Sequence, residues 1–284
     1  MDLEFKKYSY QIINHFTLKI IAIILMTIDH IGMLLFPINS NIYIILRTIG
    51  RLALPLFIFM AVEGSFHSKK PYIYVLKFLI LGFIIDIGEL VFLNRYDGNA
   101  FITLGVGTLG CVLVNRKDYY SYLAIPLAIL MILADFNFFP LRMDCSFLGL
   151  FIFIGIYLGE YLPNVYFNYL GKKLNYDNNS LEIVKKHMLR SKQNIGALCG
   201  IFIAYIAFMF LDMFNIYSFL VTNLLPFRIV SYGCLASIII LFYNGKQGYS
   251  NKFLNWGFYF YYPLHLCILY GISLLSLCIC VAFI

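Results

Sequence analysis

The stretch Leu18–Pro37 reads LKIIAIILMTIDHIGMLLFP, an apolar run that contains Asp29 and His30. A helix needs about 20 mainly apolar residues to cross a lipid bilayer, and a window of about residues 17–37 meets this requirement. Because the run is long, carries two embedded polar residues and lacks a small-residue cleavage site, we expect a retained membrane helix rather than a cleaved signal peptide. This stretch therefore predicts an α-helical membrane protein with ionisable groups inside the bilayer.

The composition of the whole chain agrees with this prediction. Its 284 residues are 62% hydrophobic and 12% charged, with a mean hydropathy of +0.83, whereas about 25% of residues in soluble domains are charged. This excludes an ordinary soluble enzyme and a disordered chain. Nucleic-acid binding is excluded as well, because no stripe of Lys and Arg lies on a soluble segment. The seven cysteines are scattered without the spacing of metal ligands, so we expect no metal.

Nine apolar windows of the chain are predicted to cross the membrane. They are about residues 17–37, 42–65, 72–93, 100–114, 119–137, 145–163, 194–214, 225–243 and 253–282. The predicted fold is an all-α, polytopic membrane helix bundle that forms a single domain over residues 1–284. The sizeable hydrophilic stretch, at about 164–193, is expected to be a cytoplasmic loop.

The distribution of Lys and Arg sets the predicted orientation. Fifteen of them lie before or at the start of the first window or in alternate connections, six of these in the 164–193 stretch, including Arg190. The opposite set of connections holds only Arg95 and Arg142. Basic residues of membrane proteins collect on the cytoplasmic face, so this asymmetry predicts a cytoplasmic N-terminus and a C-terminus outside.

Ionisable residues inside the predicted spans gather near one face of the membrane. A rise of about 1.5 Å per residue places most of them in the outer half or at the outer end of a span: Asp29, His30, Arg47, Arg51, Asp86, Glu89 and Asp144. Glu63 is expected near the inner end of the second span. Each embedded charge costs about 2.5–3.5 kcal/mol on insertion scales, which marks interior sites. We predict a polar cavity open to the outside; the alternative is that the arginines pair with acids only to lock helices together.

Two histidines, His30 and His265, are embedded in predicted spans and suit proton transfer near neutral pH. The remaining histidines lie in interfacial or loop stretches and receive no role: His15, His67 and His187. Adjacent residues on a helix point about 100° apart. We therefore expect Asp29 to meet an arginine of the second span rather than its neighbour His30.

Five segments carry a family resemblance. They are Leu18–Pro37, Leu46–Gly64 (LRTIGRLALPLFIFMAVEG), Asn99–Leu104 (NAFITL), Tyr243–Gly248 (YNGKQG) and Phe258–Leu266 (FYFYYPLHL). In this order they resemble the TraX family, which is named for a protein that N-acetylates the N-terminus of conjugative pilin. The pattern is also similar to that of the wider membrane acyltransferases. The chain departs from the family pattern at Gly88, Cys145-Ser146 and Gln247. These departures bear on the identity of the acceptor molecule more than on the acyl-transfer reaction.

The resemblance implies an acyltransferase of the bacterial cytoplasmic membrane that takes an acetyl group from acetyl-CoA on the cytoplasmic side. The acceptor is expected to be an amine or hydroxyl of a peptide, pilin-like or envelope molecule in the outer cavity. We expect His30 to act as general base, with Asp29 or Asp86 orienting it; an acyl-histidine is a second possibility. Arg47 and Arg51 are expected to clamp a phosphate or carboxylate or to stabilise the oxyanion.

The other residues expected to bind substrate are Glu63, Asp86, Glu89, Asp144, Tyr262 and His265. A proton-coupled transporter is the competing class, because embedded acids, histidines and arginines on proline-broken helices also describe such a carrier. The gathering of ionisable groups on one face and the lack of a visible inverted repeat count against a transporter. A structural membrane subunit is a third alternative.

Overall fold

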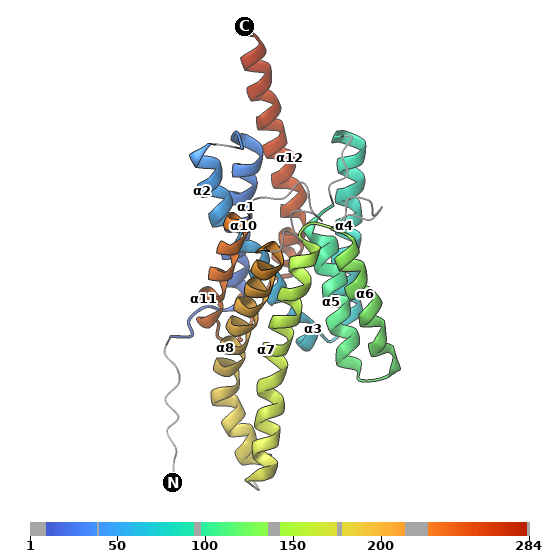
Figure 1. The fold of residues 1–284 in the computed structure, drawn as a ribbon, viewed down its shortest axis with the longest axis vertical. Coiled ribbons are helices and arrows are strands. Elements are labelled where there is room, and N and C mark those ends of the chain that lie inside the picture. The colour runs from blue at the N-terminus through green and yellow to red at the C-terminus, as the bar shows by residue number, and fades with distance from the viewer. Residues whose placement is uncertain are drawn as a thin grey trace.

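The computed structural model describes residues 10–38, 40–93, 98–135, 143–174, 178–213 and 227–282 (Figure 1). Within these ranges the regular structure is helical, apart from an isolated parallel bridge between Ile13 and Tyr243. The helices are α1 (His15–Leu35), α2 (Asn41–Gly50), α3 (Ala53–His67), α4 (Pro71–Leu93), α5 (Ala100–Arg116), η1 (Tyr119–Leu123), α6 (Ala124–Leu133), α7 (Ser146–Lys173), α8 (Asn178–Met213), α10 (Phe227–Val230), η2 (Ser231–Leu235), α11 (Ala236–Leu241) and α12 (Lys252–Ala282).

The prediction of an all-α membrane protein is confirmed. Among the described residues, five helical stretches are long and apolar enough to cross a membrane: His15–Leu35, Asn41–His67, Ser146–Lys173, Met188–Met213 and Trp256–Leu275. Shorter apolar helices lie at Ala100–Arg116, Tyr119–Leu133 and Ser231–Leu241. Every predicted window overlaps helical residues. Arg95 and Arg142, on which the predicted orientation depends in part, lie outside the described residues.

The stretch at about 164–193 differs from the predicted loop. Where it is described, it continues helices α7 and α8, which run on together beyond their apolar parts (Figure 1). Leu181 of α8 lies where a side chain on Gly171 of α7 would be, so the two helices stay in contact there. Lys, Glu, Asn and Tyr at these positions remove the membrane signal without ending a helix, because Lys and Glu are good helix formers. Hydropathy therefore predicted the apolar part of each helix but not its length.

The second predicted span consists of two helices. Arg51 and Leu52 separate α2 from α3 in a turn. Pro55 lies one turn later and has no backbone N–H, so it leaves the carbonyl of residue 51 without the usual helical donor. The break allows Arg51 to form the C-cap of α2, close to Asp29 of α1.

Glycines bring α1 and α2 into close contact. A Cβ atom on Gly50 would collide with the side chain and Cα of Asp29, and one on Gly32 would lie 2.8 Å from the Cβ of Leu46. Gly32 belongs to the segment TIDHIG, and Gly50 immediately precedes Arg51. This close approach sets the carboxylate of α1 against the arginines of α2.

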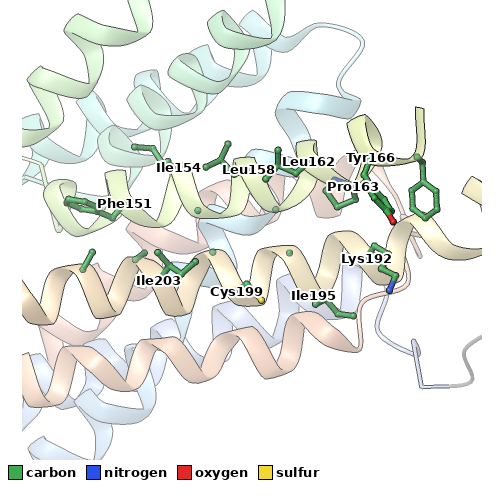
Figure 2. A pocket seen from close by; sticks show the side chains of 17 residues that line it. Phe151, Ile154, Leu158, Leu162, Pro163, Tyr166, Lys192, Ile195, Cys199 and Ile203 are labelled. Atoms are coloured by element: carbon green, nitrogen blue, oxygen red, sulfur yellow. The ribbon is translucent and has the colours of Figure 1, made fainter. Parts of the chain in front are cut away.

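Helices α7 and α8 also pack backbone to backbone. A Cβ on Gly155 would meet the carbonyl of Gly200, and a Cβ on Gly159 would meet the backbone of Gly196. The groove between these helices has a volume of about 540 Å³ and is lined mostly by apolar residues, with Lys192 at one end (Figure 2). It offers few groups for catalysis, and the ionisable residues cluster elsewhere.

Candidate active site

Asp29 of α1 lies at the centre of a buried ionic cluster and is only 6% exposed. The guanidinium groups of Arg47 and Arg51 both donate to its Oδ2, and Nε of Arg51 donates to Oδ1 at 3.2 Å. This confirms the expectation that Asp29 meets arginines of the second span. The two arginines are four residues apart and share one face of the helix, so a single carboxylate can hold both.

One polar atom in this cluster has no partner. Among the described residues, Nε of Arg47 is buried without a hydrogen bond. A buried cationic N–H that makes no hydrogen bond is costly, so this atom favours an acceptor from a ligand, such as a carboxylate or a carbonyl oxygen. Asp144 is exposed and lies within electrostatic range of both arginines.

His30 and His265 form a hydrogen-bonded pair across α1 and α12. Nδ1 of His30 lies 2.7 Å from Nε2 of His265, and Nδ1 of His265 lies 2.9 Å from the carbonyl oxygen of Tyr261. A carbonyl can only accept, so Nδ1 of His265 carries a proton and its Nε2, in the neutral ring, accepts. Nδ1 of His30 must then be the donor. His30 is left with the lone pair on Nε2, which is the form that a general base requires.

The group that orients His30 thus differs from the one expected. Asp29 and Asp86 were predicted for this role, but Asp29 is bound by the arginines and Asp86 accepts from Asn99. In the described structure it is His265 that contacts Nδ1 of His30. Because the partner lies 235 residues away, no local pattern around His30 indicates it.

Aromatic residues of α12 surround the histidine pair. The ring of Tyr262 makes edge contacts with both imidazoles, with centroid distances of 5.7 Å to His30 and 5.4 Å to His265. The hydroxyl of Tyr261 lies 2.9 Å from Oγ1 of Thr27, which connects α12 to α1. Tyr262 is therefore beside the pair, as a substrate-binding residue would have to be.

The other acids predicted for this site have separate surroundings. Asp86 is buried and accepts a 2.6 Å hydrogen bond from Nδ2 of Asn99, which caps the start of α5 through its Oδ1. Glu89 is partly exposed and lies within electrostatic range of Tyr262. Asp86 thus joins α4 to α5, and nothing in its contacts places it at His30.

The start of α7 adjoins the cluster. Asp135 caps this helix by accepting from the backbone N–H groups of Ser146 and Phe147 and from the Ser146 hydroxyl. Cys145 precedes the helix in a left-handed conformation, with φ of 50°. Such a backbone is uncommon for residues other than glycine.

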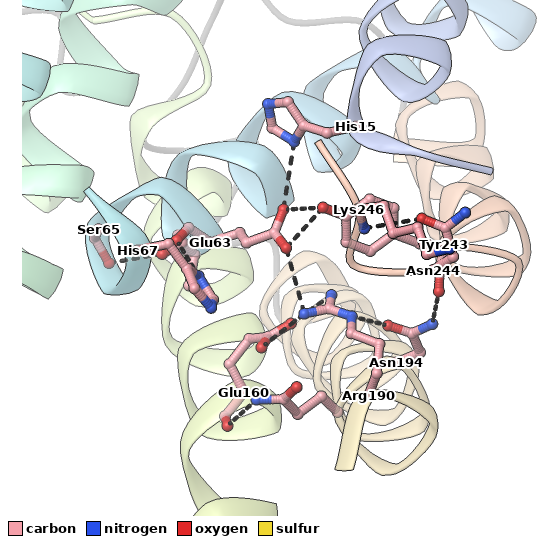
Figure 3. A network of polar contacts seen from close by, with 12 residues as sticks. His15, Glu63, Ser65, His67, Glu160, Arg190, Asn194, Tyr243, Asn244 and Lys246 are labelled. Carbon is pink, nitrogen blue, oxygen red and sulfur yellow. Dashed lines mark hydrogen bonds and ion pairs between the residues drawn. The ribbon is translucent and has the colours of Figure 1, made fainter. Parts of the chain in front are cut away.

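A second buried polar network lies around Glu63, away from the histidine pair (Figure 3). We call it the Glu63 network, made of His15, Glu63, Glu160, Arg190 and Tyr243. The Tyr243 hydroxyl donates to both oxygens of Glu63 at 2.7 and 2.6 Å, and His15 Nδ1 lies 3.4 Å from the same carboxylate. Arg190 bonds Glu160 at 3.0 and 3.3 Å and lies 3.4 Å from Glu63. A carboxylate can only accept, so the Tyr243 hydroxyl is the donor in both bonds.

Sequence reasoning predicted only Glu63 of this network as a site residue, and Tyr243 was noted only as the start of the segment YNGKQG. His15 was given no role, and Arg190 was counted as a loop charge. Glu160 lies in the predicted sixth span and is 1% exposed, so an embedded acid was the signal that could have found it. The expectation that ionisable groups gather on one face is therefore incomplete, because the start of α1 and the end of α3 hold a second buried cluster around Glu63, at the opposite end of these helices.

These observations define the class of the protein. It is an all-α membrane protein with a partly buried histidine pair and, beside it, a carboxylate held by two arginines. The family model described as TraX protein matches residues 15–163, more than half of the chain. The chain belongs to the TraX family.

Two known proteins are similar in sequence to this chain. The probable fimbrial assembly protein FimC, serogroup H1, of Dichelobacter nodosus is 29% identical over 270 residues, which cover 89% of this chain and 93% of that protein. The uncharacterized protein RP591 of Rickettsia prowazekii (strain Madrid E) is 35% identical over 91 residues, 32% of this chain and 33% of that protein. No solved structure matches the chain.

Proposed function

We propose that this protein is a membrane acetyltransferase that moves an acetyl group from cytoplasmic acetyl-CoA to an amine or hydroxyl of a peptide, pilin-like or envelope acceptor. The observation that carries the proposal is the histidine pair. Its chain of hydrogen bonds from Tyr261 through His265 leaves a lone pair on Nε2 of His30. The pair lies in two of the segments that resemble the family, TIDHIG and FYFYYPLHL.

The proposed reaction needs one proton acceptor that later becomes a donor. Nε2 of His30 removes the proton of the acceptor amine or hydroxyl while the nitrogen or oxygen attacks the thioester carbonyl. The carbon–sulfur bond then breaks, and the thiolate of coenzyme A takes the proton back from His30. The products are the amide or ester and the free thiol, and His30 regains its starting form.

The arginines supply positive charge beside the base. Arg51 is committed to Asp29 through two of its nitrogens, whereas Arg47 keeps a buried Nε without a partner in the described structure. We propose that the Nε–H of Arg47 donates a hydrogen bond to the developing oxyanion or to a carboxylate of the acceptor. Asp29 then acts as a positioning residue, because it holds both guanidinium groups in one place.

We further propose nine membrane spans, a cytoplasmic N-terminus and a location in the bacterial cytoplasmic membrane. Successive predicted spans run in opposite directions, which supports this arrangement. His15 at the start of α1 contacts Glu63 near the end of α3. Tyr72 at the start of α4 accepts a hydrogen bond from Arg116 at the end of α5. The end of α7, the start of α8 and the α5–α6 connection lie toward the lower end of Figure 1, and α2 and the C-terminal end of α12 lie toward the upper end. The fimbrial name of one relative supports an acceptor in the cell envelope.

The proposal is tested by incubating the purified full chain with radiolabelled acetyl-CoA and membranes that contain candidate acceptors. His30→Ala should lower transfer about 10²–10⁴-fold, the contribution typical of a general base. His265→Gln keeps an oxygen acceptor near the position of Nε2, so it should retain more activity than His265→Met, whose thioether sulfur is only a weak acceptor. Transfer by His30→Ala at the wild-type rate would overturn the assignment, as would equal loss in both His265 variants.

A proton-coupled transporter is the second candidate, and the Glu63 network favours it. Buried carboxylates and a histidine at one end of the helices, with a histidine pair further along, resemble a series of proton sites. Proteoliposomes distinguish the two functions. A transporter should take up protons in the absence of acetyl-CoA, and replacing Glu63 by Gln should abolish that uptake, whereas the acetyltransferase should move no protons without its donor.

A further inference from the structure

A polar cavity lies where α3, α5 and α7 end together. We call it the lysine pocket; its volume is about 700 Å³, and it is lined by Ser65, Phe66, Asn115, Lys117, Tyr161, Asn164, Val165, Asn168, Tyr169 and Lys172. None of these ten lining residues is acidic. The size is typical of pockets that hold cofactor-sized ligands, about 300–1,000 Å³.

Cationic groups reach this pocket from three helices. Lys117 forms the C-cap of α5, and Lys172 lies in the last turn of α7. Lys185 of α8 reaches the wall as well, since its Nζ donates to Oδ1 of Asn168 at 2.5 Å. Ammonium groups gathered in this way bind phosphate as point charges.

Three aromatic residues, Phe66, Tyr161 and Tyr169, are among those that line the pocket, and we call them its aromatic wall. The rings of Phe66 and Tyr161 both stack on Tyr157, which does not line the pocket, with centroid distances of 5.2 and 6.0 Å. Nζ of Lys117 lies 6.0 Å from the centroid of Tyr161. A flat base can stack on such side chains whatever its sequence identity, so the wall suits a heteroaromatic ring next to phosphate.

A buried amide in the wall is half satisfied. Oδ1 of Asn115 accepts from the Tyr157 hydroxyl at 2.8 Å, which fixes the orientation of the amide. Within the described structure, its Nδ2 is buried and makes no hydrogen bond. A donor held in this position is suited to a ring nitrogen or phosphate oxygen of a ligand.

Lys117 adopts a backbone conformation that its residue type disfavours. Its φ of 57° is left-handed, at a C-cap position where glycine is the usual residue. Glycine there would end the helix with less strain but would place no ammonium over Tyr161.

From these observations we propose that the lysine pocket binds the nucleotide end of the acyl donor, with phosphates on Lys117 and Lys172 and the base against Tyr161. This rests on the proposed function, in which the donor is acetyl-CoA, and on the proposed topology, which places these helix ends in the cytoplasm. An anionic lipid headgroup has the same phosphate chemistry. It has no ring for the aromatic wall, so the wall favours a nucleotide.

The test is equilibrium binding to the full chain in nanodiscs of zwitterionic lipid, with coenzyme A and adenosine 3′,5′-bisphosphate as probes. The double variant Lys117→Gln with Lys172→Gln should weaken both about tenfold or more, because it removes charge-assisted bonds to phosphate. The matched control is Lys69→Gln with Lys70→Gln, which removes two exposed lysines outside the pocket. This control should bind both probes within about twofold of the wild type, as expected for exposed charges that are screened by salt and do not line the pocket.

Three results would overturn the proposal: wild-type affinity in the Lys117/Lys172 variant, equal weakening in both double variants, or loss of nucleotide binding when phosphatidylglycerol is added to the nanodiscs. Lys117→Gly gives a second check, since it should leave thermal stability unchanged or higher and still weaken binding. The failure of the proposed function would look different. Nucleotides would then bind in the expected way, but no acetyl transfer dependent on His30 would occur.

Discussion

At the scale of single residues, Asp29 has the largest structural role of the predicted site residues. Its single negative charge is shared by two guanidinium groups that would otherwise lie without a counter-charge in surroundings of low polarity. Breaking a buried ion pair by removing one partner is far more costly than the pair is stabilising, because an uncompensated charge remains. We therefore expect Asp29 both to stabilise the fold and to hold the guanidinium group of Arg47 in position.

Asp29→Asn should destabilise the protein by about 3–5 kcal/mol, since it leaves two buried cations opposite a neutral amide. Thermal unfolding of the purified protein in detergent measures this effect. Asp144→Asn is the matched control, because Asp144 is exposed and should change stability by about 1 kcal/mol or less. Equal unfolding temperatures for the two variants would show that the Asp29 cluster does not stabilise the fold.

At the scale of elements, the contact between α1 and α2 builds the candidate active site. Gly50 permits this contact, because any side chain there would overlap Asp29. Gly88 in α4 offers a useful contrast, since a Cβ there would meet nothing within 4 Å. The two glycines are both helical, but only one is required by packing.

Gly50→Ala should destabilise the protein by about 1–3 kcal/mol, the usual cost of overpacking, and should reduce acetyl transfer because α2 moves away from Asp29. Gly88→Ala should instead stabilise it by up to about 1 kcal/mol, because alanine is the better helix former. Unfolding midpoints and transfer rates measured on both variants check this pair. An active, fully stable Gly50→Ala protein would contradict the packing argument.

At the scale of the whole molecule, the Glu63 network ties together segments that are far apart in the sequence. The network joins the start of α1 and the YNGKQG turn to the polar halves of α7 and α8. Two backbone hydrogen bonds reinforce this connection: the N–H of His15 donates to the carbonyl of Lys246, and the N–H of Asn244 donates to the carbonyl of Ile13. Gly245 and Gly248 have φ values of 72° and 70°, which lets the turn pass close to Arg190 and Asn14. The motif YNGKQG is thus accounted for by packing at this end of the bundle.

The proposed topology predicts which connections face the outside. In a chain with its seven cysteines replaced, Ser40→Cys should react with a membrane-impermeant maleimide on intact cells, because the α1–α2 connection is expected outside. Lys69→Cys, between α3 and α4, should react only after the cells are permeabilised. The reverse pattern would invert the orientation, and labelling of both on intact cells would contradict the span count between them.

The sequence by itself determined the class of structure, most of the helices and the residues from which to seek a site. Hydropathy and the spacing of Lys and Arg depend on residues that are near one another in the chain, so they can be read without a fold. The pairing of Asp29 with an arginine also followed, because the neighbouring span carried two arginines on one face and few other partners.

Only the tertiary structure decided how these residues are combined. It placed His265 on Nδ1 of His30, gave Asp86 to Asn99, and brought His15, Glu160 and Arg190 around Glu63. Such pairings depend on which helix faces oppose each other, and that depends on where glycines allow backbones to approach and where Pro55 interrupts a span. Because these contacts join residues up to 235 positions apart, no local pattern contains them.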